Sequence, residues 1–276
     1  MRRRALLQGA GAAAAVLAAP WVRAQGFDHA HAAWTALLAR HVVLLRGGQA
    51  SQLRYAAVAA ERPALHAVLA ALSAPGRADY ERFTKDQQQA FLINAYNAFT
   101  VELVLTRYPD LTSIRDLGGL FGNPWKPKWV PLLGAKLSLD DIEHAMLRAR
   151  GVFDEPRVHF AVNCASVGCP MLREEAYVAE RLDAQLGQQA GRFMADRTRN
   201  RYDLQRRRLT LSRIFDWYEE DFTLGHRGIT SVAAFAARHA DRLADAPADR
   251  ERIRAASVPV GFLDYDWSLN DVRAAT

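Results

Sequence analysis

The sequence has little cysteine and, after its first 24 residues, no long apolar run. Only Cys164 and Cys169 occur among 276 residues, so the fold cannot depend on a dense disulfide framework. A membrane-spanning helix needs roughly 20 apolar residues, and no segment after residue 24 supplies them. Internal repeats, heptads and long flexible linkers are absent as well, which suits one globular domain with a substantial core.

An excess of basic charge is also missing once the first residues are set aside. The chain has 36 Lys and Arg against 30 Asp and Glu, a net charge of +6. Four of the arginines lie before residue 25. Without them the chain has 32 basic and 30 acidic residues, a net charge of +2. The high isoelectric point is therefore no argument for binding nucleic acid, and we expect no nucleic-acid partner.

The first 24 residues have the three parts of a secretory signal. Residues 2–4 are all arginine, residues 5–19 are uncharged and mostly Ala and Leu, and residues 22–24 (Val-Arg-Ala) fit the cleavage rule. We therefore expect a signal peptide over residues 1–24, cleavage before Gln25, and a single globular domain over residues 25–276. The alternative is a retained N-terminal anchor, although residues 5–19 are short for a bilayer core.

The same segment indicates an export route. Residues 3–8 (Arg-Arg-Ala-Leu-Leu-Gln) are similar to the twin-arginine signal, which the export machinery reads as an address and not as an anchor. We predict a soluble periplasmic protein delivered by that route, with the general secretory route as the alternative. Half of the residues are hydrophobic, which argues against disorder.

Hydrophobic periodicity predicts a mainly helical chain. Residues 85–107 are apolar on most of a helical circumference, as is typical of a helix buried on most sides. A second helix is expected over residues 138–150, because Ser138 and Asp141 have the spacing of a capping box. Between the two, residues 115–137 are rich in Gly, Pro and Trp and predict a long loop, a feature often used as a functional lid.

Strands are few in the predicted fold. Residues 157–163 alternate between apolar and other side chains, which predicts a strand with His159 and Asn163 on the same face. Residues 201–204 and 208–211 predict a hairpin. The expected class is therefore α+β, a mainly helical single domain with a small sheet.

Residues 157–170 are the segment most typical of a functional site, because they contain both cysteines, and three interpretations compete. Export favours a Cys164–Cys169 disulfide, whose short loop would stabilise the fold by roughly 2 kcal/mol. In the second, Cys164 is a nucleophile with His159 as its base, which requires a lowered thiol pKa. In the third, His159, Cys164 and Cys169 bind zinc, but their spacing matches no common structural zinc pattern, so we expect no cofactor.

A second set of polar residues lies on the helix expected over residues 138–150. Asp140, His144 and Arg148 follow one another at intervals of one turn, away from the apolar face. An aspartate one turn before a histidine can fix the orientation of its ring, as catalysis requires. The alternative is an ordinary solvated charge stripe with weak pairing.

Two asparagines interrupt the apolar helix. Asn94 and Asn97 lie on the face of residues 85–107 that also carries Ala90 and Val101. A buried amide is costly unless its hydrogen bonds are satisfied. These side chains therefore either tie down neighbouring backbone or line a polar pocket.

Five motifs, in order over roughly residues 80–225, resemble the family known as domain of unknown function 547. The family brings no established reaction, but the resemblance implies that these polar residues belong together. The motifs are Phe91-Leu-Ile-Asn-Ala-Tyr-Asn-Ala, Ser113-Ile-Arg-Asp-Leu, Leu137-Ser-Leu-Asp-Asp-Ile-Glu-His, Val158-His-Phe-Ala-Val-Asn-Cys-Ala-Ser with Gly168-Cys-Pro, and Leu211-Ser-Arg-Ile-Phe-Asp-Trp-Tyr with Asp221-Phe222.

The resemblance implies one polar pocket built from residues 91–98, 138–150 and 157–170. A buried helix followed by a histidine on a strand is also similar, at the level of fold, to papain and transglutaminase, although the helix here carries Asn94 where those enzymes place a cysteine. The residues expected at the pocket are Asn94, Asn97, Asp140, His144, His159, Asn163, Cys164 and Ser166.

Two classes of function remain open from the sequence. The first is a thiol-dependent hydrolase or acyl transferase, with Cys164 as the nucleophile and His159 or His144 as the base. The second is a non-catalytic binding or envelope-structural protein in which Cys164 and Cys169 form a structural disulfide. A small molecule or a peptide is the expected ligand in either case.

Overall fold

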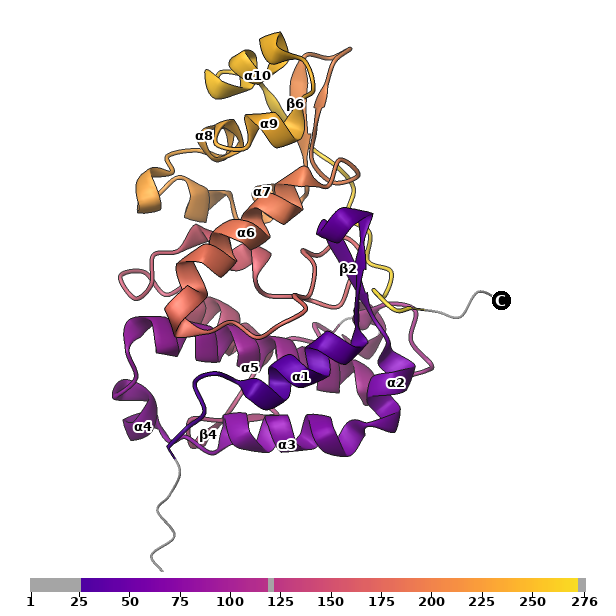
Figure 1. The fold of residues 1–276 in the computed structure, drawn as a ribbon, viewed down its shortest axis with the longest axis vertical. Helices are drawn as coiled ribbons and strands as arrows, with labels where there is room; N and C mark the ends of the chain where they lie inside the picture. Colours follow the sequence, from indigo (N-terminus) through magenta and orange to yellow (C-terminus); the bar gives the residue numbers. More distant parts are fainter. Residues whose placement is uncertain (1–25, 119–121, 273–276) are drawn as a thin grey trace, which may run out of the picture.

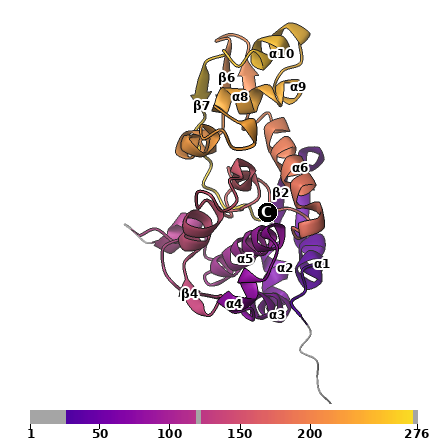
Figure 2. The same cartoon turned by 90° about the vertical axis from the view of Figure 1, so that its left-hand side faces the viewer.

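The computed structural model describes residues 26–118 and 122–272, which form two lobes (Figure 1). The predicted signal peptide, residues 1–24, lies outside the described residues. Among the helices that are described, none is long and apolar enough to cross a membrane. A view turned by 90° shows the same separation of the lobes, with helix α6 (Leu182–Ala195) reaching from one to the other (Figure 2).

Each lobe has its own hydrophobic core. The first core includes Phe91 and Ile142, and the second includes Phe215 and Phe235. Helix α6 contributes to both, since Leu186 packs in the first core whereas residues from 190 onward pack in the second. The lobes are therefore joined through a packed helix and not through a flexible linker.

The centre of the first lobe is helix α5 (Lys85–Leu105). Thr84 caps its first turn by accepting a hydrogen bond from the N–H of Gln87 at 3.2 Å, and the side-chain oxygen of Gln87 accepts one from the N–H of Thr84 at 2.9 Å. Almost every side chain from Gln89 onward is buried, because neighbouring elements cover most sides of the helix. The predicted buried helix is confirmed.

Short helices and two antiparallel hairpins surround α5 in the first lobe. The register of the second hairpin pairs Val130 with Leu137, so the predicted loop over residues 115–137 contains a hairpin in its last part. The elements are α1 (Ala32–His41), β1 (Val42–Leu45), η1 (Arg46–Gly48), β2 (Ala50–Leu53), α2 (Tyr55–Ala60), α3 (Arg62–Ser73), α4 (Arg77–Glu81), η2 (Ile114–Gly118), β3 (Val130–Leu132), β4 (Ala135–Leu137) and the π-helix η3 (Asp141–Leu147).

The second lobe packs small helices against a three-stranded sheet. Strand β6 lies between the other two, antiparallel to β5 and parallel to β7, which confirms the predicted hairpin and the α+β class. The elements are β5 (Arg201–Asp203), β6 (Arg208–Leu211), α7 (Ile214–Trp217), η6 (Glu219–Phe222), η7 (His226–Gly228), α8 (Val232–Ala237), α9 (Ala240–Leu243), α10 (Pro247–Arg254) and β7 (Val260–Phe262).

The strand predicted over residues 157–163 is wrong. The segment begins as the 3₁₀ helix η4 (Pro156–Phe160) and continues as an irregular stretch between the lobes, before a further 3₁₀ turn, η5 (Ala179–Arg181). Its alternating pattern has another cause, because the segment passes between two cores: Val158 packs in the first and Phe160 in the second. Burial on both sides produced an alternation that is typical of a strand.

The last described residues tie the two lobes together. Residues 263–272, called the strap below, follow strand β7 and run back to the first lobe. Leu263 donates its N–H to Leu211 O in the second lobe at 2.8 Å, and Leu53 in the first lobe donates to Asn270 O at 2.9 Å. On the way the strap crosses the segment that carries both cysteines.

Candidate functional site

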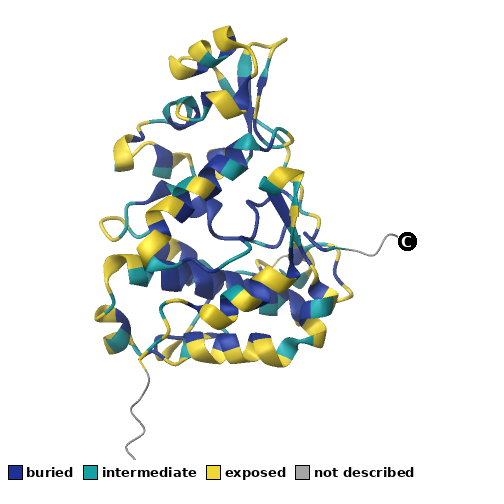
Figure 3. Ribbon diagram, viewed as in Figure 1, coloured by how far each residue is buried: buried dark blue, intermediate teal, exposed yellow. Residues whose placement is uncertain are grey.

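A cavity of about 210 Å³ opens where the lobes meet. The chain around it is mostly buried, as the dark blue ribbon between the lobes shows (Figure 3). Both lobes, the segment between them and the strap contribute side chains to the cavity. The lining residues are Tyr96, Asn123, Trp125, Asp140, Glu143, His144, His159, Val162, Cys164, Cys169, Pro170, Ile214, Trp217, Tyr218, Tyr265 and Trp267.

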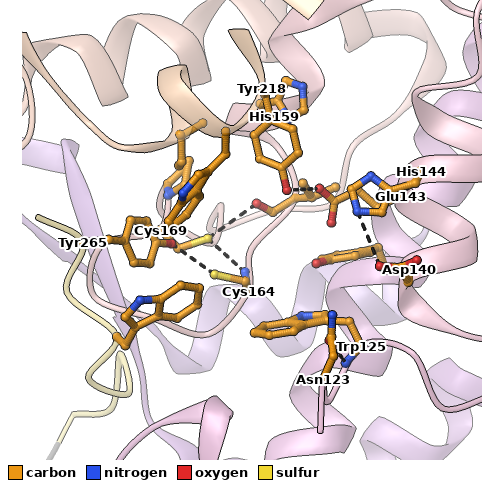
Figure 4. A pocket seen from close by; sticks show the side chains of 16 residues that line it. Asn123, Trp125, Asp140, Glu143, His144, His159, Cys164, Cys169, Tyr218 and Tyr265 are labelled. Carbon is orange, nitrogen blue, oxygen red and sulfur yellow. Dashed lines mark hydrogen bonds and ion pairs between the residues drawn. The ribbon is translucent and has the colours of Figure 1, made fainter. Parts of the chain in front are cut away.

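Two sides of the cavity carry different chemistry (Figure 4). Cys164, Cys169 and Tyr265 lie on one side, which we call the sulfur wall. Across the cavity lie the side chains of what we call the charged wall, with Tyr218 above and Trp125 below in the same view. The charged wall consists of Asp140, Glu143, His144, His159 and Tyr218.

In the sulfur wall both cysteines are free thiols in hydrogen-bond contact. Cys164 donates its backbone N–H to the sulfur of Cys169 at 2.9 Å, and the Tyr265 hydroxyl lies 3.2 Å from the sulfur of Cys164. The hydrogen bond from Cys169 is the main cause that lowers the pKa of Cys164 to about 7, against the opposing effect of burial. Burial raises the pKa of Cys169, so this thiol stays protonated and can donate.

The loop that carries the cysteines is fixed by backbone hydrogen bonds from the strap. Val167 donates to Ser268 O and Gly168 to Asp266 O, both at 2.8 Å. A side chain at Gly168 would meet backbone atoms of Asp266 at 3.0 Å, so a glycine is needed for this close approach. Ala165 adopts a φ of 64°, which turns the chain sharply after Cys164.

His159 in the charged wall is held by a carboxylate behind it. Its Nε2 lies 2.6 Å from Asp221 Oδ2, and Arg148 donates to both oxygens of Asp221 at 2.6 and 3.2 Å. Burial lowers the pKa of His159, although the contact with Asp221 acts in the opposite direction. Burial alone would raise the pKa of Asp221, but the hydrogen bonds from His159 and Arg148 outweigh it and hold that pKa far below its ordinary value.

Tyr218 covers the ring of His159 on the cavity side of the charged wall. The two rings stack with centroids 4.0 Å apart, and the Tyr218 hydroxyl donates to Glu143 Oε1 at 2.8 Å. Burial and the neighbouring carboxylate of Glu143 raise the pKa of Tyr218, so the phenol remains a neutral donor. This stack fixes the plane of the imidazole.

His144 has partners on both ring nitrogens. Its Nε2 lies 3.5 Å from Asp140 Oδ1, and its Nδ1 lies 2.5 Å from Nη1 of Arg148. His144 therefore contacts both other members of the predicted stripe, Asp140 and Arg148. Arg148 also joins this stripe to Asp221, and hence to His159.

The helix beneath this stripe starts as predicted and ends early. Ser138 and Asp141 exchange two hydrogen bonds of 2.9 Å, which confirms the capping box. The end predicted near residue 150 is wrong, because η3 stops at Leu147 and winds as a π-helix in which the N–H of Arg148 bonds to Glu143 O. Short π-helical turns are frequent at functional sites.

The asparagines predicted at the pocket, Asn94, Asn97 and Asn163, form hydrogen bonds with the backbone around the cavity. Asn97 donates to Ala161 O at 3.0 Å and accepts from the N–H of Asn163 at 2.8 Å, while Asn94 forms a similar pair of bonds with the backbone of Tyr177. Asn163 donates to Pro170 O at 2.7 Å and so closes the cysteine loop. These amides tie down backbone, and they are not among the side chains that line the cavity.

Ser166 lies beside the sulfur of Cys164. Its hydroxyl is 3.6 Å from that sulfur and contributes to lowering the pKa of the thiol.

Within residues 26–118 and 122–272, no group of three or more His, Cys, Asp and Glu side chains is arranged to hold a metal ion. Of the suggested zinc ligands, His159 uses Nε2 for Asp221.

Comparison with known proteins finds a family model that matches part of the chain. The model of the family described as "Protein of unknown function, DUF547" matches residues 80–194. This segment, less than half of the chain, is similar to the DUF547 family. The match ends before the last motif of the predicted resemblance, residues 211–222. No curated protein and no solved structure matches the chain significantly.

The part that matches DUF547 supplies only some of the cavity. It contains the sulfur atoms, the π-helix η3 and His159, whereas Tyr218, Asp221 and Tyr265 lie beyond it. None of these three residues is predicted as a site residue from the sequence. Tyr218 and Asp221 belong to the last motif of the predicted resemblance, whereas no local pattern marks Tyr265, because its partner Cys164 is far away in the sequence.

Aromatic side chains line the remaining sides of the cavity. Trp217 and Trp267 stack with centroids 5.6 Å apart, and Tyr265 packs against both. Trp125 comes from the loop predicted as a lid, and its buried Nε1 has no hydrogen-bond partner among the described residues.

Proposed function

We propose that this protein is a thiol-dependent hydrolase or acyl transferase with Cys164 as its nucleophile. The observation that carries the proposal is the thiol of Cys164, which faces the cavity between the lobes with a pKa lowered to about 7. A thiol of this kind is about half ionised at neutral pH and needs no base to become a nucleophile. Its stabilising donors are Cys169, Tyr265 and Ser166.

In the proposed reaction, the thiolate of Cys164 attacks an acyl carbon and forms a thioester. The leaving group departs with the bonding electrons and takes a proton from solvent. Water then attacks the thioester and gives a proton to His159, after which the acid leaves, the thiolate is restored and His159 returns its proton to solvent. In a transferase, an amine or alcohol replaces that water. The free N–H of Trp125 is the proposed donor to the developing oxyanion.

His159 is the better of the two histidines for the role of base. The Asp221 contact holds Nε2 as the donor and leaves Nδ1 as the acceptor, and the lowered pKa keeps the ring neutral. His144, in contrast, has a partner on each ring nitrogen, Asp140 on Nε2 and Arg148 on Nδ1. Asp221 is then the third member of a Cys–His–Asp set that the sequence did not identify.

The lining of the cavity supports a neutral or cationic acyl substrate. Asp140 and Glu143 contribute carboxylates, and among the described residues that line the cavity no Lys or Arg side chain is present to receive an anion. The aromatic walls suit flat or apolar groups, and they also attract cations. A small molecule or a peptide end with these properties is the proposed ligand.

The proposal places this chemistry in the periplasm after removal of residues 1–24. The second candidate is a binding or envelope-structural protein with a permanent Cys164–Cys169 bridge. What supports it is the closeness of the two sulfur groups, which share a direct hydrogen bond. The two functions differ in whether Cys164 reacts.

Acylation with p-nitrophenyl acetate, followed by intact mass spectrometry, tests the proposal. We expect release of nitrophenol with an acetyl group on Cys164, and neither in Cys164→Ala. In His159→Ala the acetyl adduct should form but persist, because water lacks its base. The acyl-transfer function would be overturned if the wild-type protein gained no adduct on Cys164, either with p-nitrophenyl acetate or with p-nitrophenyl esters of longer acyl chains.

A further inference from the structure

We propose that Cys164 and Cys169 form a reversible dithiol–disulfide couple, which exchanges two electrons with a small disulfide compound that enters the cavity. This activity goes beyond acyl transfer and does not depend on it, although both reactions begin at Cys164. The permanent bridge of the second candidate function is also different, since that bridge would not open and close. The couple needs two thiols that meet, one that reacts first, and a path for the oxidant.

The two thiols already meet in the reduced protein. Four residues separate the cysteines, and a turn closed by the bond from Cys169 N to Ser166 O brings the chain back on itself. The sulfur of Cys169 then lies 2.9 Å from the backbone nitrogen of Cys164, and the two side chains share a hydrogen bond. A disulfide requires close approach of the two Cβ atoms, and this loop provides it with little movement.

The strap holds the loop in that shape. Three backbone hydrogen bonds of 2.8 to 2.9 Å join residues 165, 167 and 168 to the strap. Asn163 adds a bond to Pro170 O across the base of the loop. Because the loop is already ordered while the thiols are reduced, closing the disulfide requires little further loss of conformational entropy.

The environments of the two thiols differ, which gives the exchange an order. Cys164 is half-buried and faces the cavity with a pKa of about 7, whereas Cys169 is 5% exposed and protonated. The attacking thiol should be the ionised and accessible one. An incoming disulfide therefore meets Cys164 first, and Cys169 lies behind it as the resolving thiol.

The reaction balances as two successive exchanges. The thiolate of Cys164 attacks one sulfur of a disulfide RSSR, forms a mixed disulfide with one RS group, and releases the other as RS⁻. Cys169 gives its proton to that RS⁻ and, as a thiolate, attacks the sulfur of Cys164. The products are the Cys164–Cys169 disulfide, one RSH and one RS⁻, so RSSR gains the two electrons that the protein loses.

The second exchange is helped by the first. Burial is the main cause of the raised pKa of Cys169, but its hydrogen bond to Cys164 and the repulsion from a thiolate there also raise it. Once Cys164 is in a mixed disulfide, its negative charge is gone and both of these causes disappear. Cys169 thus becomes more acidic at the stage when it has to react.

The enclosed position of Cys164 selects a small oxidant. The thiol lines a cavity of about 210 Å³ with aromatic walls, and it does not lie on an open surface. A disulfide between two protein chains would not reach it, whereas a compound of a few atoms on each side of the sulfur pair would. Hydroxyethyl disulfide, with 2-mercaptoethanol as its reduced form, is a suitable probe.

The test is a redox titration of the purified full chain in mixtures of hydroxyethyl disulfide and 2-mercaptoethanol, read by alkylation and intact mass. We expect an internal disulfide, seen as the loss of two hydrogens, whose fraction rises with the disulfide and falls again with the thiol. Cys169→Ser should stop at one mercaptoethanol adduct on Cys164. Cys164→Ser should take up no adduct at its buried Cys169.

Three outcomes would overturn the couple: a wild type that stops at the mixed disulfide, one that does not react, or a bridge that stays closed at every ratio. Circular dichroism of each variant verifies that it is folded. The acyl-transfer function is read separately from the acetyl adduct on Cys164. An acetyl adduct without a reversible disulfide therefore rejects the couple alone, and the reverse result rejects acyl transfer alone.

Discussion

The two walls of the cavity are built in different ways. The sulfur wall comes mainly from one short stretch, residues 163–170, ordered by backbone hydrogen bonds and completed by Tyr265. The charged wall combines side chains from η3, η4 and the α7–η6 region, held by ion pairs and side-chain hydrogen bonds. The surroundings of the thiol thus depend on local backbone geometry, whereas the position of His159 depends on how the two lobes meet.

The largest effect should come from removing the proposed nucleophile of the sulfur wall. Cys164→Ser replaces a thiol that ionises near pH 7 by a hydroxyl that does not, so we expect turnover of a p-nitrophenyl ester to fall by roughly 10⁴-fold. The change is small in volume, and the unfolding midpoint in urea should stay nearly the same. An ester activity that survives in this variant would place the chemistry elsewhere.

The next largest effect concerns the charged wall. Asp221→Asn removes the carboxylate that orients His159 and pairs with Arg148, so we expect deacylation to slow by roughly 10²-fold or more. It also leaves the half-buried Arg148 without its partner, at a cost of about 3 kcal/mol in unfolding free energy. Stopped-flow decay of the acetyl adduct and urea unfolding measure the two effects. Acylation of Cys164 itself should be almost unchanged, and a parallel loss would contradict the separation of the walls.

A smaller effect is expected from the second thiol. Cys169→Ala removes the main donor to the thiolate, so the pKa of Cys164 should rise from about 7 toward the ordinary thiol value. The rate of alkylation by iodoacetamide at pH 7 should then fall by about tenfold. The pH dependence of that rate measures the shift directly. An unchanged midpoint would mean that Cys169 does not stabilise the thiolate.

The same lowered pKa has a consequence for stability. The folded protein favours the ionised Cys164, so the free energy of unfolding should rise between pH 7 and pH 9 and lose this contribution as the pH falls through about 7. Cys164→Ala should flatten the curve in this window. Urea unfolding of the two proteins at pH 6, 7, 8 and 9 provides the measurement, and equal slopes would show that the thiol does not ionise preferentially in the fold.

The smallest effect should come from the strap. Tyr265→Phe deletes one hydroxyl that bonds to Cys164, with a loss of about 1 kcal/mol in unfolding free energy and a slight rise in the pKa of the thiol. The alkylation midpoint should move less than in Cys169→Ala. A larger shift would make Tyr265, and not Cys169, the principal donor to the thiolate.

Features that depend on nearby residues could be predicted from the sequence. The capping box of Ser138 and Asp141, the buried helix α5 and the hairpin of β5 and β6 each follow from patterns within a few turns. The grouping of Cys164 with Cys169 was equally local. The stripe of Asp140, His144 and Arg148 was visible because one turn separates its members.

Contacts between distant residues could not be predicted in this way. Asp221 meets His159 only because the second lobe folds back on the first, and Tyr265 meets Cys164 only because the strap crosses the cysteine loop. Periodicity was misleading at residues 157–163, because this irregular segment is buried between two cores: Val158, Ala161 and Val162 pack in the first and Phe160 in the second. The distant likeness to papain and transglutaminase stays a prediction.

The strap also determines when the site can exist during the life of the chain. Its residues leave the ribosome after both lobes have been made, and without them the cysteine loop lacks its backbone partners and Cys164 lacks Tyr265. An unfinished chain therefore has no properly formed thiol site, and translation must reach the strap before Cys164 acquires its reactivity. The environment that lowers the pKa of Cys164 is therefore complete only when synthesis has reached the strap.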